Sequence, residues 1–180
     1  LKPDFVRIYP VLVIENTELA DQYRAGEYEP LSTEQAITYC AFLKDWFERH
    51  NIEVIRTGLQ STEELDSGNS LVAGPYEPAM GERVVNEQYK QRIERCINEH
   101  IESFIDKELS QWNIWGQVNT YIALNISIYY PRSLTSKVRG LKNRNMLYFQ
   151  EKYPYININW YEDSTRNTVR CCIDGLQYVL

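Results

Sequence analysis

The chain has 180 residues and a net charge of −6, and it holds no run of about 18 apolar residues, so a bilayer-spanning helix is excluded. Its composition, 43% hydrophobic and 24% charged, is typical of a globular protein. Residues 1–90 hold 8 basic and 16 acidic side chains, whereas residues 91–180 hold 11 basic and 9 acidic. We therefore expect the two halves to meet different partners.

The first half predicts a βαβ unit. Residues 6–14 form a β-branched and aromatic run typical of a buried strand, in which Pro10 indicates a bulge or an edge position. A capping box at 32–35 starts a helix that ends near His50. A second strand follows at 52–60, and the crossover predicts that it is parallel to the first.

The second half predicts a smaller α+β unit behind a long helix. Residues 61–81 form a loop with at most one helical turn. The remaining elements are a helix at 82–109, a strand at 121–131, one or two helices at 133–153 broken near Gly140, and strands at 155–163 and 167–179. We expect an α/β class with an α+β second half, and a boundary near residues 80–90 that separates residues 1–85 from residues 86–180.

Function in an α/β sheet or barrel collects at the carboxyl ends of the strands, which are predicted at 15–17 and 58–60. Strand alternation places Arg56 and Gln60 on one face, together with Val54 and Gly58. On the first strand, Arg7 and Tyr9 share a face against Val6 and Ile8. A helix-covered face favours the aliphatic set, so Arg7, Tyr9, Arg56 and Gln60 are expected to point inward. An inward arginine needs either a structural carboxylate or an anionic ligand group.

Metal and nucleophile chemistry finds little support in the sequence. The four cysteines, Cys40, Cys96, Cys171 and Cys172, match no zinc or cluster spacing and are expected to be reduced core residues of a cytoplasmic protein. Cys96 and His100 are four residues apart on one predicted helix, but two ligands alone favour packing. His50 at a helix end is explained by the helix dipole. No catalytic residue and no metal site can be assembled from these residues.

A basic segment lies at residues 132–144, which contain no acidic residue in an otherwise acidic protein. Contact with a phosphate backbone is one interpretation, with Tyr129, Tyr130 and Tyr148 available for stacking, and a solvated helical face is the other. The cationic residues of this segment are Arg132, Lys137, Arg139, Lys142 and Arg144.

Three blocks, "RIYPVLVIENTELADQYRAGEYEPLSTEQA", "VIRTGLQSTEEL" and "LVAGPYEPAMGERV", resemble the C-terminal part of radical S-adenosylmethionine (radical SAM) proteins. The resemblance is to the bacterial branch related to the elongator catalytic subunit, which is often labelled oxygen-independent coproporphyrinogen III oxidase-like. It covers residues 4–88 closely, and "SKVRGLKNRN" is similar to the variable tail of the group.

The resemblance implies the last strands of a partial (β/α) barrel, followed by an appended module. The parent enzyme would bind S-adenosylmethionine and a [4Fe–4S] cluster held on a CxxxCxxC loop. This chain lacks that motif and starts just before a strand without an initiator Met, so we expect a C-terminal fragment that binds neither group and is inactive alone. Its expected partner is the N-terminal part of its own barrel, and no membrane contact is expected. Two substrates stay open, tRNA and a small metabolite. Tyr9, Arg56 and Gln60 would contact S-adenosylmethionine or substrate.

Three positions depart from the pattern of the group. Asn16 replaces a glycine but tolerates a left-handed turn, Ser61 replaces a proline, and Glu77 replaces a histidine. Residues 90–180 have no counterpart of the elongator acetyltransferase domain. Two other hypotheses stay open: the second half is an RNA-binding accessory module without catalysis, or it is a structural or dimerisation module.

Overall fold

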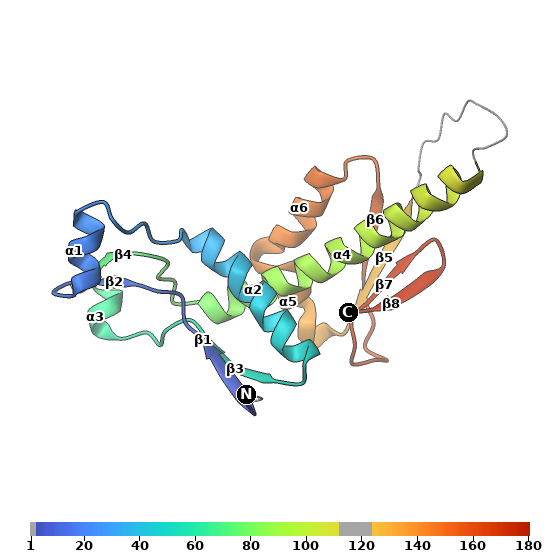
Figure 1. The fold of residues 1–180 in the computed structure, drawn as a ribbon. Coiled ribbons are helices and arrows are strands. Elements are labelled where there is room, and N and C mark those ends of the chain that lie inside the picture. Colours follow the sequence, from blue (N-terminus) through green and yellow to red (C-terminus); the bar gives the residue numbers. More distant parts are fainter. Residues whose placement is uncertain (1–2, 112–123) are drawn as a thin grey trace. The chain divides into compact units, whose positions relative to one another are not determined.

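The structure is a computed structural model that describes residues 3–111 and 124–180 (Figure 1). The chain divides into two compact units, Leu1–Gln88 and Tyr89–Leu180, called unit 1 and unit 2 below. Both contain helices and strands, which confirms the predicted mixed α/β class. The predicted strand at 121–131 is described from residue 124, and its first three residues lie outside the described part.

Unit 1 contains the predicted βαβ unit. Strand β1 (Phe5–Ile8) pairs in parallel with β3 (Glu53–Thr57), and α2 (Thr33–Arg49) connects them. Helix α2 begins at a capping box, because the Ser32 hydroxyl accepts from the Gln35 amide and the Gln35 side chain accepts from the Ser32 amide. Its buried residues Ile37, Cys40 and Ala41 pack with Met80 and Val84 of the next long helix.

The predicted strand at 6–14 is divided in two. After β1 the chain leaves the pair with β3, and β2 (Val13–Ile14) pairs antiparallel with β4 (Leu71–Ala73), a strand that the sequence did not reveal. Pro10 lies in the gap between β1 and β2, and its missing N–H explains why the ladder stops there. Two short helices complete this region: α1 (Glu18–Arg24) and α3 (Glu63–Asp66).

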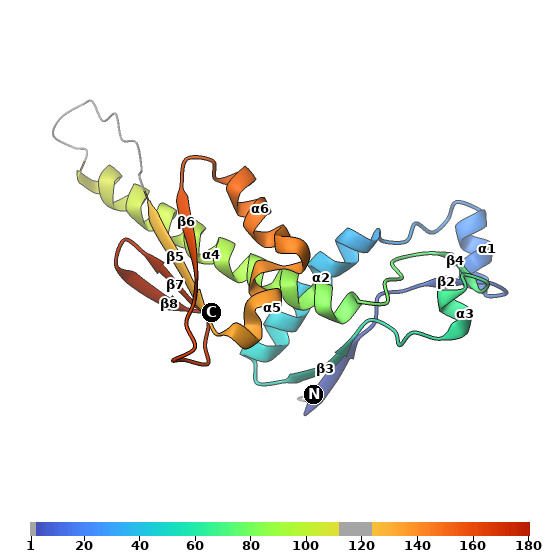
Figure 2. The same ribbon diagram turned by 180° about the vertical axis from the view of Figure 1, so that it is seen from behind.

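Unit 2 is built on a four-stranded sheet with the order β6-β5-β7-β8 (Figure 2). Strand β5 (Asn125–Tyr130) pairs in parallel with β6 (Asn157–Glu162) and antiparallel with β7 (Arg170–Ile173). Strand β8 (Leu176–Val179) forms a hairpin with β7 across the turn that contains Gly175. The parallel β5–β6 pair requires a crossover, which the helices between these strands provide.

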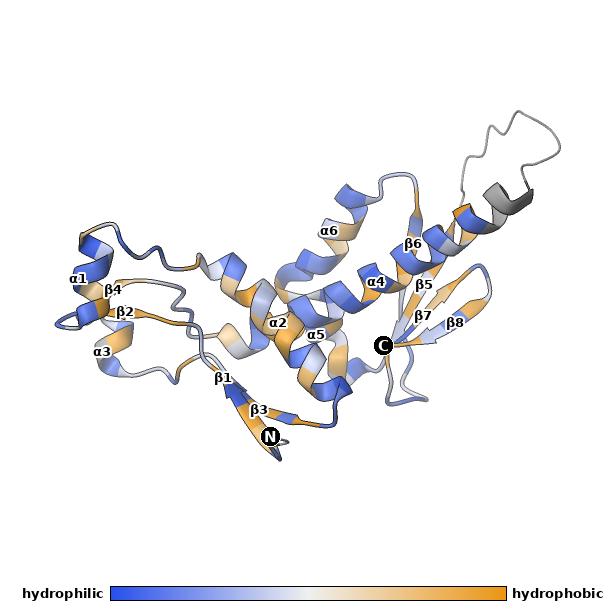
Figure 3. Cartoon of the chain, viewed as in Figure 1, coloured by the Kyte–Doolittle hydropathy of each residue, from blue (hydrophilic) through white to orange (hydrophobic). Residues whose placement is uncertain are grey.

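The helices of unit 2 cover one face of this sheet. Helix α4 (Met80–Gln111) begins in unit 1 and continues into unit 2, and the part of it that is coloured in Figure 3 is largely hydrophilic. A 3₁₀ turn (Arg132–Leu134), α5 (Thr135–Arg139), a second 3₁₀ turn (Leu141–Asn143) and α6 (Arg144–Lys152) form the crossover, which is broken at Gly140 as predicted.

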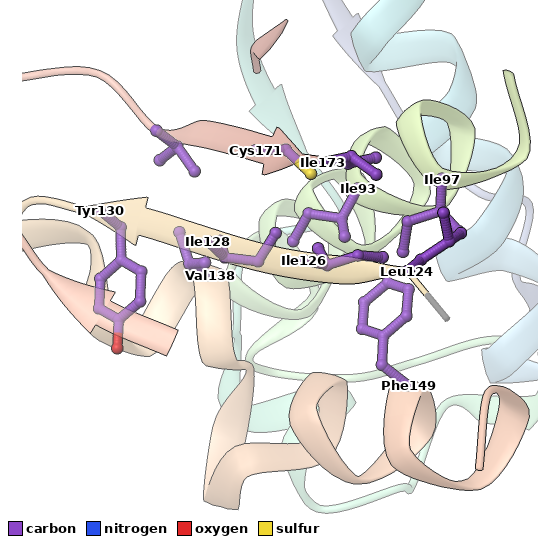
Figure 4. Packing of buried hydrophobic residues seen from close by; sticks show 11 residues of the cluster. Ile93, Ile97, Leu124, Ile126, Ile128, Tyr130, Val138, Phe149, Cys171 and Ile173 are labelled. Atoms are coloured by element: carbon purple, nitrogen blue, oxygen red, sulfur yellow. The ribbon is translucent and has the colours of Figure 1, made fainter. Parts of the chain in front are cut away.

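The core of unit 2 lies between these helices and the sheet (Figure 4). Ile126, Ile128 and Tyr130 alternate along β5 and are fully buried. They pack with apolar residues of α4, α5, α6 and β7, among them Ile93, Val138, Phe149 and Cys171. The side chains that alternate with these buried residues point to the other face of the sheet. On β5, β6 and β7, none of the side chains on that face is aliphatic.

Candidate functional site

The face of the β1–β3 pair that points away from α2 carries two arginines side by side. Arg7 is the register partner of Arg56, and both side chains are exposed. Ile8 packs against the core that α2 forms, so the residues that alternate with it face the opposite side. Two guanidinium groups on neighbouring strands form a cationic surface suited to a carboxylate or a phosphate.

A β-bulge corrects one part of the predicted alternation. Val6 pairs with Val54 and Arg7 pairs with Arg56, so Ile55 is the extra residue on β3. Val54 is therefore half-buried with Val6, and it does not share the exposed face with Arg56 as predicted. Ile55 is 42% exposed instead of lying with the buried set. Strand alternation alone cannot reveal a bulge, because the bulge changes the period by one residue.

The three predicted ligand-binding residues lie in this region. Arg56 Nη1 donates to Gln60 Oε1 at 3.2 Å, so its partner in the structure is an amide rather than a carboxylate. Tyr9 follows β1 directly and is 42% exposed. Within residues 3–111 and 124–180, Arg7 and Arg56 form no ion pair with a carboxylate. Both therefore retain their capacity for an anionic ligand.

The predicted carboxyl-end residues of the first strand lie elsewhere. Glu15, Asn16 and Thr17 follow β2, so they do not lie at the end of β1. Glu15 forms an ion pair with Arg24 at 2.6 Å, and this hydrogen bond lowers the pKa of the Glu15 carboxyl below its usual range. Asn16 has a φ of 58°, a left-handed conformation that asparagine tolerates.

The loop that follows β4 is held by hydrogen bonds and ion pairs. Ser61 and Tyr76 both donate to the Asp66 carboxylate, and these bonds lower the pKa of Asp66 below its usual range. Glu77 forms an ion pair with Arg83 at 2.9 Å, and Arg83 also pairs with Glu34 of α2. Glu77 thus connects this loop to the start of α4.

The residues of the basic segment have different environments. Arg132, Lys142 and Arg144 are exposed, and no carboxylate within the described part of unit 2 pairs with them. Lys137 is also exposed. Arg139 differs from them, because its Nε donates to the buried Tyr130 hydroxyl at 2.5 Å and its guanidinium lies 5.5 Å from the Tyr130 ring centroid.

The three predicted stacking tyrosines are not equivalent. Tyr130 is fully buried, and Lys90 Nζ lies 4.6 Å from the ring centroid of Tyr148, so neither offers a free ring as predicted. Tyr129 lies on the uncovered face of the sheet and stacks on Tyr161. Sequence reasoning missed Tyr161 because the parallel register that brings it beside Tyr129 is a tertiary feature.

The cysteines and histidines form no ligand set. Burial raises the pKa of Cys40 to about 11 and that of Cys171 to about 12, and burial also raises the pKa of Cys96. His100 Nδ1 lies 3.2 Å from the Tyr178 hydroxyl, and His50 stacks on Trp46. Within the part of the chain that the structure describes, no three His, Cys, Asp or Glu residues could hold a metal ion together.

The described helices also include none that is long and apolar enough to cross a membrane.

Comparisons with known proteins identify unit 1. Residues 3–91 match the family model of the radical SAM C-terminal domain. A 43-residue segment is 51% identical to a tRNA uridine(34) acetyltransferase of Methanocaldococcus jannaschii, covering 24% of this chain and 8% of that protein. A 42-residue segment is 48% identical to the enzyme of the same name from Methanocaldococcus infernus, with 23% and 8% covered. Both relatives are archaeal rather than bacterial. No solved structure matches the chain.

Proposed function

Residues 3–91 belong to the radical SAM C-terminal domain family, and on this premise we propose that unit 1 forms the last wall of a radical SAM barrel. In this proposal the exposed face of β1 and β3 lines the barrel interior, and α2 covers the outside. The observation that carries it is the pairing of Arg7 with Arg56 on the face opposite α2. A face with two cations and an amide is better suited to binding an anionic ligand than to packing against an apolar core.

S-adenosylmethionine carries a carboxylate that such a pair could hold. The planar fork of Arg56 binds a carboxylate through two parallel N–H donors, and its bond to Gln60 fixes the orientation of that fork. Tyr9 adds an exposed aromatic ring with a hydroxyl at the carboxyl end of β1. Tyr9, Arg56 and Gln60 are accordingly the residues that we propose to bind S-adenosylmethionine or the substrate.

The thiols of this chain do not suit an iron–sulfur cluster. Cys40 and Cys171 are buried in the cores of different units, and their raised pKa values disfavour the thiolates that a cluster needs. The cluster would be held by the N-terminal part of the same barrel, and with S-adenosylmethionine it supplies a 5′-deoxyadenosyl radical. The role of unit 1 is to close the wall and bind the ligand.

The outer helix also carries a surface suited to the rest of the barrel. Tyr39, Phe42, Leu43 and Trp46 follow the helical spacing i, i+3, i+4, i+7 along α2, and each is at least 40% exposed. A stripe of this size on a helix already buried on another face favours a second packing partner. We propose that this stripe packs against the preceding helix of the barrel.

The test uses the intact protein, reconstituted anaerobically with iron and sulfide. About four irons per chain, and 5′-deoxyadenosine formed on reduction, are expected for the radical class. Absence of both iron and 5′-deoxyadenosine would reject the barrel proposal for this protein. Binding of S-adenosylmethionine to the same preparation, measured by isothermal titration calorimetry, separates ligand binding from reductive cleavage.

A second function rests on the basic segment of unit 2. The exposed cations Arg132, Lys137, Lys142 and Arg144 form a surface suited to phosphates, and the named substrate of both relatives is tRNA. We propose that unit 2 binds tRNA in the cytoplasm, where reduced thiols persist. Arg139 is excluded from this surface because it is bound to Tyr130.

Charge reversal tests the second function. Lys137→Glu with Lys142→Glu should weaken tRNA binding and reduce the slope of log K against log salt by about 1 for each phosphate that the variant no longer binds. Arg24→Glu changes the same kind of charge at a surface position of unit 1, where Arg24 is 49% exposed, and should leave binding unchanged. Equal binding by the double variant and the wild type would reject the proposed RNA surface.

A further inference from the structure

The uncovered face of the unit 2 sheet has a composition unlike that of its core face. Residues that alternate with the buried Ile126, Ile128 and Tyr130 point away from the helices. Register places these residues in rows across the strands, and the first row contains Tyr161, Tyr129, Arg170 and Val179. The second row contains Asn159, Ser127, Cys172 and Gln177.

Three side chains of the first row, Tyr161, Tyr129 and Arg170, stack on one another. The rings of Tyr129 and Tyr161 lie 5.3 Å apart between centroids with an angle of 24° between their planes. The Arg170 guanidinium lies 5.6 Å from the Tyr129 centroid, on the neighbouring strand. Tyr161 is 45% exposed, so the outer end of this row is accessible.

Arg170 is buried, and its side chain contacts protein groups rather than solvent. It is 9% exposed, its Nη2 donates to Asp163 at 2.5 Å, and its buried Nε has no hydrogen-bond partner among the described residues. A buried polar group without a partner is uncommon and carries a cost. Here the stacking of Arg170 on Tyr129 compensates for part of it, and it keeps a cation in the row.

The rest of this face suits the edges and phosphates of a nucleotide. Amide side chains of Asn125, Asn157, Asn159 and Gln177 both donate and accept hydrogen bonds. In β5 to β8, as described, no residue that alternates onto this face is acidic. Arg166 lies in the turn between β6 and β7 and is exposed.

We propose that this face binds an unpaired base of single-stranded RNA by stacking on the outer side of the Tyr161 ring, which extends the row formed by Tyr161, Tyr129 and Arg170. An exposed aromatic ring accepts any base, because every base has a π-face, and one stacked base contributes about 5- to 150-fold in affinity. The inference rests on the proposal that unit 2 binds RNA. It differs in that the contact is made with the bases of the RNA, by residues of the sheet. The basic segment lies on the crossover between β5 and β6, and its proposed contacts are with the phosphates of the RNA.

The experiment compares two ligands with the whole protein. One is a 12-nucleotide oligouridylate, and the other is an abasic oligomer with the same number of phosphates; binding is measured by fluorescence anisotropy. Tyr161→Leu should weaken oligouridylate binding by at least about fivefold and bring it toward that of the abasic oligomer. It should leave abasic binding unchanged, whereas Lys137→Glu with Lys142→Glu should weaken both.

Two further variants distinguish stacking from folding. Tyr161→Phe should retain oligouridylate binding, since stacking needs the ring and not the hydroxyl. Tyr155→Leu replaces a tyrosine of the same unit that is 94% exposed and lies outside the sheet, and it should have no effect. If Tyr161→Leu binds oligouridylate as tightly as the wild type and has the same thermal midpoint, the proposal is overturned. Binding equal to that of the abasic oligomer in the wild type would overturn it as well.

Discussion

Arg7 and Arg56 are register partners on adjacent parallel strands, and both side chains lie on the face that α2 does not cover. Like charges placed directly opposite each other on a sheet disfavour the pairing. The bulge at Ile55 produces this arrangement, because it brings Arg56 rather than Ile55 beside Arg7. A bound anion would relieve the repulsion, which is the physical reason to expect a ligand here.

Replacing Arg56 by Lys should weaken binding of S-adenosylmethionine to the intact enzyme by about tenfold, because lysine cannot form two parallel hydrogen bonds to a carboxylate. Isothermal titration calorimetry measures the change. Arg24→Lys alters an arginine whose partner is Glu15 and serves as the control. Unchanged affinity and turnover in Arg56→Lys would reject Arg56 as a ligand-binding residue.

Replacing Gly58 by Ala should destabilise unit 1 by about 2–5 kcal/mol. Gly58 has a φ of 80°, and an added Cβ would lie 2.6 Å from the Met80 side chain. Gly26→Ala is the matched control, since its φ is 75° and an added Cβ would meet nothing within 4 Å. Urea unfolding should show the larger loss for Gly58→Ala, and equal losses would contradict the packing against Met80.

Replacing Tyr130 by Phe should destabilise unit 2 by about 1–2 kcal/mol, because Arg139 then loses the hydroxyl that accepts from its Nε. The ring remains, so the core volume is conserved. Thermal unfolding followed by circular dichroism measures the effect. Tyr155→Phe removes an exposed hydroxyl and should change nothing; a shift as large as that of Tyr130→Phe would exclude the buried hydrogen bond as the cause.

The stability of unit 2 should fall at high pH through Cys171. Burial raises the pKa of this thiol to about 12 from an ordinary value of 9.0, so the folded state holds its proton where the unfolded state releases it. The stabilisation is complete below pH 9 and is lost as the pH rises toward 12. Above about pH 9 the free energy of unfolding should therefore fall less steeply with pH in Cys171→Ala than in the wild type. The difference between the two slopes should be up to about 1.4 kcal/mol per pH unit. Identical slopes in urea unfolding between about pH 8 and about pH 10.5 would contradict a buried neutral thiol.

Local patterns predicted most elements correctly. The capping box placed the start of α2, and helical periodicity placed α4 to within a few residues. The prediction of one strand at 6–14 was wrong, because the apolar run continues through Pro10 although the chain leaves the β1–β3 pair there. Strand β4 has only three residues in a loop rich in turn formers, so its antiparallel partner β2 defines it more than its own composition does.

Residue type and order determined that this chain contains a βαβ unit, that its second half carries a basic segment, and that its blocks resemble the radical SAM C-terminal part, which the family match confirms. The βαβ unit follows from propensity, capping and spacing, the basic segment from composition, and the resemblance from the sequence of the three blocks. Only the tertiary structure decided which side chains meet: Arg7 beside Arg56 through a bulge, Arg139 on Tyr130, and Tyr161 on Tyr129 across parallel strands. Strand register joins residues far apart in the sequence, and no local pattern encodes it.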